Sequence, residues 1–316
     1  MAILTTREAE ETLARDPVEA LEAARAEVGR IDLSPCDRAR VWEEYAQACR
    51  VLGDYARADA CYERAEELCT CRACLPRRHR RITYLRVHQG DYRDALRRAQ
   101  EALATARSEQ EVGRAEVAIA YVYGNIGEAR PAIRHARTAL RRLGAEDHLW
   151  AGSALVTISL AALSGAEVPD SELRELAREL GNLSKQWPRQ GVWRAHRARV
   201  RMIRVLIRDR LGTIRPAELR DGLREVQKTM VDLGLLREAL EITAHTAELC
   251  AGMRREEQAA RCVQAMLEAL PSSLPRHVAV AIRKLRRSLE AVDRGEIPRA
   301  AAELRAAISL RSSPAV

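Results

Sequence analysis

The sequence predicts an all-α fold in which helical hairpins stack into an α-solenoid. Apolar residues make up 47% of the 316 residues, enough for each hairpin to bury a face against the next. The aromatic share is only 3%, with no Phe, and the helix formers Ala and Leu dominate. Alternating β-branched runs that would indicate strands are hard to find. Glycines also recur at a fixed interval, which indicates repeats.

The repeat has a period of 37 residues, because Gly53, Gly90 and Gly127 follow one another at that spacing in similar sequence surroundings. We expect each glycine to end one helix, since glycine tolerates the left-handed conformation that closes a helix. The next helix carries Ala five and twelve residues later, which lets two helices approach closely. These alanines are Ala58, Ala65, Ala95, Ala102, Ala132 and Ala139.

Residues 38–143 resemble the tetratricopeptide repeat (TPR) family, whose pattern combines W-x2-L-G-x2-Y with a later A-x3-F. The matching residues are Trp42, Tyr45, Ala46, Cys49, Gly53, Tyr55, Ala58, Tyr62 and Ala65, then Gly90, Tyr92, Ala95, Ala99 and Ala102, then Ala120, Tyr123, Gly127, Ala132, Ala136 and Ala139. The period departs from the usual 34, and the Trp is lost after the first repeat. The resemblance implies a right-handed superhelix, which we expect to contain about fifteen helices.

Three regions are expected along the chain. Residues 1–33 read as an N-terminal half repeat or cap, with Asp16 and Pro17 opening a helix. Residues 34–143 hold three TPR-like repeats. Residues 144–316 read as divergent repeats continuous with them, with helix-ending glycines at Gly165, Gly212, Gly252 and Gly295. This second part also resembles the sensor portions of large bacterial transcription activators, although no DNA-binding helix-turn-helix is evident.

Enzymatic motifs are missing from the sequence. The sixteen glycines are never closer than three residues apart, which excludes the dinucleotide motif G-x-G-x-x-G, and no phosphate-binding loop is present. Neither H-E-x-x-H nor the nucleophile motif G-x-S-x-G occurs. We therefore expect a non-enzymatic protein with no catalytic residues and no cofactor.

Cysteines cluster at Cys69, Cys71 and Cys74, the best candidates for a metal site. A tetrahedral zinc site needs a fourth ligand, for which Cys61, His79 and Cys36 are the alternatives. A second C-x2-C at suitable spacing is missing, so we expect structural thiols and no metal. The N-terminus MAILTTREAEE does not read as a signal peptide, and the uncharged stretch 149–166 reads as a buried helix. These features predict a cytoplasmic protein with reduced thiols and no membrane association.

The TPR resemblance implies that a partner lies against the first helix of each hairpin. Counted from the repeat glycines, the groove positions are Arg40, Gln47, Arg77, Arg80, Tyr84, His88, Arg114, Tyr121 and Asn125. An Arg ladder of residues 40, 77 and 114 beside Tyr suits an acidic peptide or a C-terminal carboxylate. We therefore expect an adaptor or regulatory subunit that binds a protein or peptide.

A basic helix offers the alternative of nucleic-acid binding. The net charge is +8, and fifty of the 53 basic residues are Arg. A stripe with spacings of three and four is formed by Arg194, Arg197, Arg201, Arg204 and Arg208. Such a stripe could follow phosphates. Only Trp193 provides an aromatic ring for base stacking there, so a solvated face is the favoured interpretation.

Overall fold

The computed structural model describes residues 9, 12–13, 17–143, 147–163, 168–187, 193–233, 239–240, 242–244, 246–247, 256–270, 276–291 and 295–309. These residues form helices and their connections, without a strand among them, so the predicted all-α class is confirmed. The chain divides into two compact units, residues 1–196 and 197–316.

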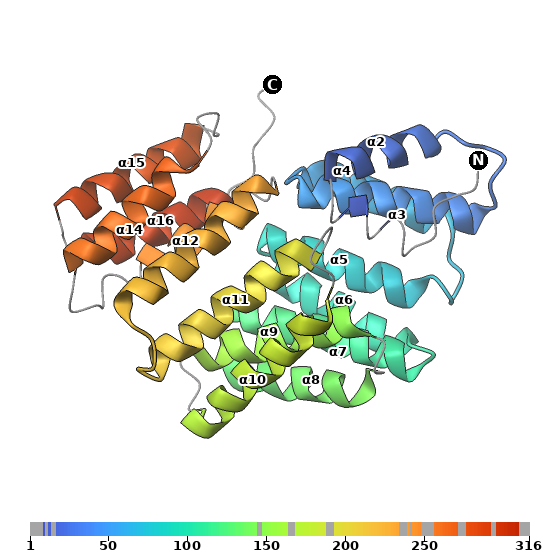
Figure 1. Ribbon diagram of the computed structural model, residues 1–316. Helices are drawn as coiled ribbons and strands as arrows, with labels where there is room; N and C mark the ends of the chain where they lie inside the picture. The colour runs from blue at the N-terminus through green and yellow to red at the C-terminus, as the bar shows by residue number, and fades with distance from the viewer. Residues whose placement is uncertain are drawn as a thin grey trace. The chain divides into compact units, whose positions relative to one another are not determined.

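The first unit is built from helices that pack on their neighbours in chain order (Figure 1). They are α2 (Pro17–Glu27), α3 (Pro35–Val51), α4 (Tyr55–Leu68), α5 (Leu75–Gln89), α6 (Tyr92–Thr105), α7 (Glu109–Ile126), α8 (Ala129–Arg142), α9 (His148–Leu163) and α10 (Asp170–Gln186). Helices α3 and α4, α5 and α6, and α7 and α8 form three hairpins. The first helices of consecutive hairpins also contact one another, which fits a solenoid-like arrangement.

The predicted 37-residue period is present in the backbone. Gly53, Gly90 and Gly127 have φ values of +84°, +79° and +90°, at the turn inside each hairpin. In the helix that follows each turn, the alanines predicted for close approach are completely buried. They are Ala58, Ala65, Ala95, Ala102, Ala132 and Ala139, each with 0% exposure. The methyl side chain therefore sets the short distance between paired helices.

Side-chain caps fix where several of these helices begin. Ser34 accepts from the backbone N–H of Asp37 over 3.1 Å at the start of α3. Asp54 accepts from the N–H of Arg57 and Asp91 from the N–H of Asp94, each over 3.1 Å. Each cap satisfies one of the backbone donors that a helix start leaves unpaired.

Within the uncharged stretch 149–166, the residues up to 163 belong to α9, which is largely buried as predicted, and residues 164–166 lie outside the described residues. Gly152 in this helix lies against the indole of Trp187, and a Cβ at this glycine would meet the ring at 2.6 Å. The close contact holds the end of α10 against α9 and explains the small residue in the middle of an apolar helix. No helix in the described part of the chain is both long and apolar enough to cross a membrane.

The second unit contains the rest of the helices with defined bounds. Helix α11 (Trp193–Arg210) spans the division between the units, and α12 (Pro216–Asp232), α14 (Glu256–Glu268), α15 (Arg276–Glu290) and α16 (Glu296–Ser309) follow. Gly212 has a φ of +65° just beyond α11, in the helix-ending role predicted for it. Gly165 and Gly252, given the same role, lie outside the described residues. Leu285, Leu304 and Val263 are among the side chains of the apolar core.

Candidate functional site

Aromatic side chains meet where the first helices of consecutive hairpins lie against each other. The rings of Tyr84 on α5 and Tyr121 on α7 contact edge to face, with centroids 5.2 Å apart. Trp150 on α9 stacks on Tyr84 with a centroid separation of 6.5 Å. All three residues are half-buried.

Two guanidinium groups complete this site. The Arg80 guanidinium carbon lies 4.5 Å from the Trp150 ring centroid, and that of Arg114 lies 5.9 Å from it. Attraction between a cation and an aromatic face reaches about 6 Å, so both are in range. We call the set Arg80, Tyr84, Arg114, Tyr121 and Trp150 the aromatic strip. Four of its members were predicted, and the structure brings them together on three adjacent helices.

The predicted Arg ladder consists of arginines that already have carboxylate partners. The Nε of Arg77 donates to Glu43 Oε2 over 2.9 Å, and Arg40 lies 3.8 Å from a carboxylate oxygen of Asp37. Arg114 binds Asp147 through two nitrogens, at 3.0 and 3.1 Å. The ladder is therefore not a row of unpaired cations, and most of its charge is offset within the protein.

The other predicted groove residues differ in accessibility. Gln47 is buried and hydrogen-bonded to the Tyr62 hydroxyl and to Arg50, so it belongs to the first hairpin's interior. His88 packs edge to face against Tyr55 with centroids 5.8 Å apart. Asn125 is exposed and donates to the Tyr121 carbonyl over 2.8 Å. The exposed Asn125 extends the accessible surface beside the aromatic strip.

The basic stripe on α11 is solvated and partly neutralised. Arg194, Arg201, Arg204 and Arg208 are exposed, while Arg197 is half-buried. Within the second unit, Arg201 pairs with Glu225, and Arg208 lies 3.1 Å from Glu218. Two of the five cations therefore already face carboxylates from α12, which weakens their attraction for phosphate.

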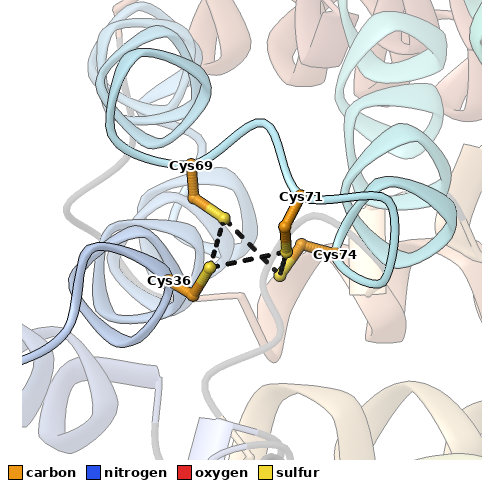
Figure 2. A group of neighbouring side chains, drawn as sticks. All are labelled: Cys36, Cys69, Cys71 and Cys74. Carbon is orange, nitrogen blue, oxygen red and sulfur yellow. Dashed lines mark hydrogen bonds between the residues drawn. The ribbon is translucent and has the colours of Figure 1, made fainter.

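Four thiols converge at the junction between the first two hairpins (Figure 2). The Sγ atoms of Cys36, Cys69, Cys71 and Cys74 all lie within 4.8 Å of one another. Sequence reasoning left the fourth member open among Cys36, Cys61 and His79, and the structure selects Cys36. Cys61 instead lies in the core between α3 and α4 with Cys49. We call the four residues the thiol cluster.

Comparison with models of known protein families and with curated proteins gave no match to this chain.

Sequence reasoning missed Trp150 and the carboxylate partners of the Arg ladder. Two of the missed partners lie nearly one repeat away: Glu43 is 34 residues from Arg77, and Asp147 is 33 residues from Arg114. Residues about one period apart occupy neighbouring first helices. A search for opposite charges and shared residue types at that separation would have found these pairs, and Cys36 with Cys69 as well.

Proposed function

We propose that this protein is a TPR-like, non-enzymatic adaptor or regulatory subunit that binds an acidic peptide segment of a partner along the aromatic strip. The observation that supports the proposal is the joining of Tyr84, Tyr121 and Trp150 with two arginines across three consecutive first helices. Aromatic and Arg side chains are enriched among residues that dominate protein interfaces. Their rigid rings bury a large area at a small cost in side-chain entropy.

The proposal of a carboxylate-bearing peptide rests on the N–H donors of Arg114 that Asp147 does not occupy. Asp147 occupies its Nε and Nη2, and Asp147 is itself buried, so the guanidinium is held in place. The Arg114 side chain remains 30% exposed, and a guanidinium carries five N–H donors. A carboxylate of the partner can therefore bind the Nη1 edge while neighbouring side chains pack on Tyr121. An arginine fixed before binding loses less side-chain entropy on binding.

The test uses immobilised peptides of equal length that are acidic, neutral or basic, each with a free or an amidated C-terminus. We expect the full-length protein to bind acidic peptides, and Tyr121→Ala to weaken binding by roughly 30-fold, corresponding to about 2 kcal/mol. Arg114→Lys should also weaken binding, because Lys cannot bind two carboxylates through a planar fork. Tyr92→Ala is the matched control, since Tyr92 is an exposed tyrosine on a second helix, α6.

Melting temperatures of the same variants separate binding from packing. If Tyr121→Ala melts far below the unchanged protein and binds in proportion to its folded fraction, the ring has only a packing role. Equal binding of acidic and basic peptides would contradict the proposal that a carboxylate of the partner binds the Nη1 edge of Arg114. Peptide binding unaffected by either substitution would place the partner site elsewhere.

Nucleic-acid binding through the α11 stripe is the alternative proposal. It is less well supported, because Glu225 and Glu218 offset two of the stripe's arginines. A salt titration with single- and double-stranded DNA distinguishes it. Binding that falls steeply with salt, ignores sequence and is lost in an Arg194→Gln/Arg204→Gln variant would favour this alternative.

A further inference from the structure

The thiol cluster draws its members from three consecutive elements. Cys36 lies in the first turn of α3, Cys69 caps the C-terminus of α4, Cys71 lies in the turn that follows, and Cys74 caps the N-terminus of α5. The Sγ of Cys36 lies 2.7 Å from that of Cys69 and 3.4 Å from that of Cys71. The Sγ of Cys74 lies 3.0 Å from that of Cys71 and 3.8 Å from that of Cys69. All four sulfurs point toward one centre (Figure 2).

These separations match the dimensions of a four-thiolate zinc site. With Zn–S bonds of about 2.3 Å, the sulfurs of a tetrahedral site are about 3.8 Å apart. The Cys69–Cys74 separation already has this value, and the closest pair would need to open by only about 1 Å. A disulfide would instead place two sulfurs about 2.05 Å apart, in pairs and not as a group of four.

The surroundings favour negative charge at the cluster. Cys36 and Cys74 lie at the N-termini of α3 and α5, where the helix dipoles have their positive ends. Arg78, which is 1% exposed, donates from Nη1 to the carbonyl oxygen of Cys69 over 2.5 Å. Its Nη2 is buried without a hydrogen-bond partner among the described residues. Four thiolates on one Zn²⁺ carry a net charge of −2, and this buried cation beside Cys69 offsets part of it.

We propose that Cys36, Cys69, Cys71 and Cys74 bind one zinc ion. Each thiol releases its proton to solvent as its sulfur binds the metal. Four protein ligands fill the tetrahedral shell, which leaves no position for a water nucleophile, so the site is structural. The ion would join the start of α3 to the turn between α4 and α5, and so clamp the first hairpin to the second. This inference is independent of the peptide-binding proposal.

The sequence alone led to the opposite expectation, because no fourth ligand was convincing. Cys36 is separated from Cys69 by 33 residues, and only the stacking of hairpins brings it to the cluster. Soft thiolate ligands in a tetrahedral group suit zinc and iron, whereas magnesium and calcium prefer oxygen. Four sulfur ligands therefore favour zinc or iron over magnesium and calcium. We assign zinc to the site.

The experiment measures metal in the full-length protein, expressed with zinc in the medium and purified under reducing conditions without chelator. Elemental analysis should find one zinc ion per chain. Replacing zinc with Co²⁺ should give the intense visible absorption of a tetrahedral cobalt–thiolate site. Cys36→Ser should lower zinc content to a small fraction of one per chain at low free zinc. Cys61→Ala is the matched control, because it removes a buried thiol of the same hairpin outside the cluster, and it should retain zinc.

A melting experiment on the unchanged protein keeps the test valid even if Cys36→Ser fails to fold. A zinc chelator should lower its melting temperature, and added zinc should restore it, because an ion that binds only the folded state stabilises it. The proposal is overturned if the reduced protein holds no zinc and gives no cobalt spectrum. It is also overturned if iron replaces zinc at one per chain, if a folded Cys36→Ser keeps its zinc, or if mass analysis of freshly isolated protein finds Cys36–Cys69 and Cys71–Cys74 disulfides.

Discussion

The Nε of Arg78 on α5 donates to Oε1 of Glu43 on α3 over 2.8 Å, and both side chains are almost completely buried, at 1% and 0% exposure. The same carboxylate accepts a hydrogen bond from Arg77 over 2.9 Å and lies 3.6 Å from Arg81. Glu43 therefore contacts three guanidinium groups from the first helix of the next hairpin, and Arg81 also pairs with Glu44 on α3 at 2.9 Å. Charges removed from water in this way need their partner, since the cost of an unpaired buried charge is several kcal/mol.

The first prediction is that Glu43→Gln strongly destabilises the fold. The amide keeps the shape of the side chain but removes the anion that pairs with Arg77 and Arg78, whereas Arg81 keeps Glu44 at 2.9 Å. We expect the free energy of unfolding to fall by about 3–5 kcal/mol, measured by urea denaturation of the first unit's transition. Glu63→Gln, at an exposed position on α4, is the control and should change it by less than about 0.5 kcal/mol. Equal effects of the two substitutions would contradict the role given to Glu43.

The second prediction concerns the turn glycine of the second hairpin. A Cβ at Gly90 would have no atom within 4 Å, but the residue has a φ of +79°. Gly90→Ala therefore tests backbone strain alone, and we expect a loss of about 1–2 kcal/mol in thermal or urea unfolding. Gly29→Ala is the matched control, because its Cβ would also meet no atom and its φ is not in the positive region. A Gly90→Ala protein as stable as the control would show that this turn relaxes without cost.

The third prediction is a loss of stability below neutral pH that involves His79. Burial lowers the pKa of His79 below its ordinary value, and Arg98 and Arg78 add to the effect, while Glu101 and Glu66 oppose it. The unfolded chain therefore binds more protons than the folded chain once the pH falls below about 6.5, the ordinary value for histidine. The contribution is fully present above this pH and is lost progressively as the pH falls toward the lower folded pKa.

His79→Gln should flatten the dependence of unfolding free energy on pH between about 7 and 5, by less than one proton per chain. Urea denaturation at a series of pH values measures the slope. His148→Gln, which replaces a histidine at the start of α9, is the control. A slope that stays the same in His79→Gln but changes in the control would assign the effect to another group.

The repeat turns and the helix contacts that follow them could be predicted from sequence because they depend on local properties. Gly53, Gly90 and Gly127 are needed for backbone conformation, and the alanines five residues later are needed for close helix contact. Glycine provides the left-handed backbone conformation, and alanine provides the small side chain, whatever residues lie elsewhere in the chain. The all-α class and the hairpin boundaries follow from such positions.

The partners of charged and thiol side chains could not be predicted in the same way. The ladder arginines Arg77 and Arg114 have the expected places on the first helices, but whether they are unpaired depends on Glu43 and Asp147 one repeat away. Trp150 lies in the divergent part, where the family pattern no longer marks groove positions. These contacts depend on how each hairpin is rotated relative to the next one. The sequence of a single hairpin does not specify that rotation.

The shared carboxylate of Glu43 has a consequence for how this chain can change by duplication or loss of repeats. The junction of the first two hairpins depends on matched groups from both sides, since Glu43 comes from one hairpin and its three arginines from the next. A hairpin copied or inserted at this junction would separate the acid from its bases and leave both buried. The first two hairpins are therefore not interchangeable modules, and their order is fixed by their side chains.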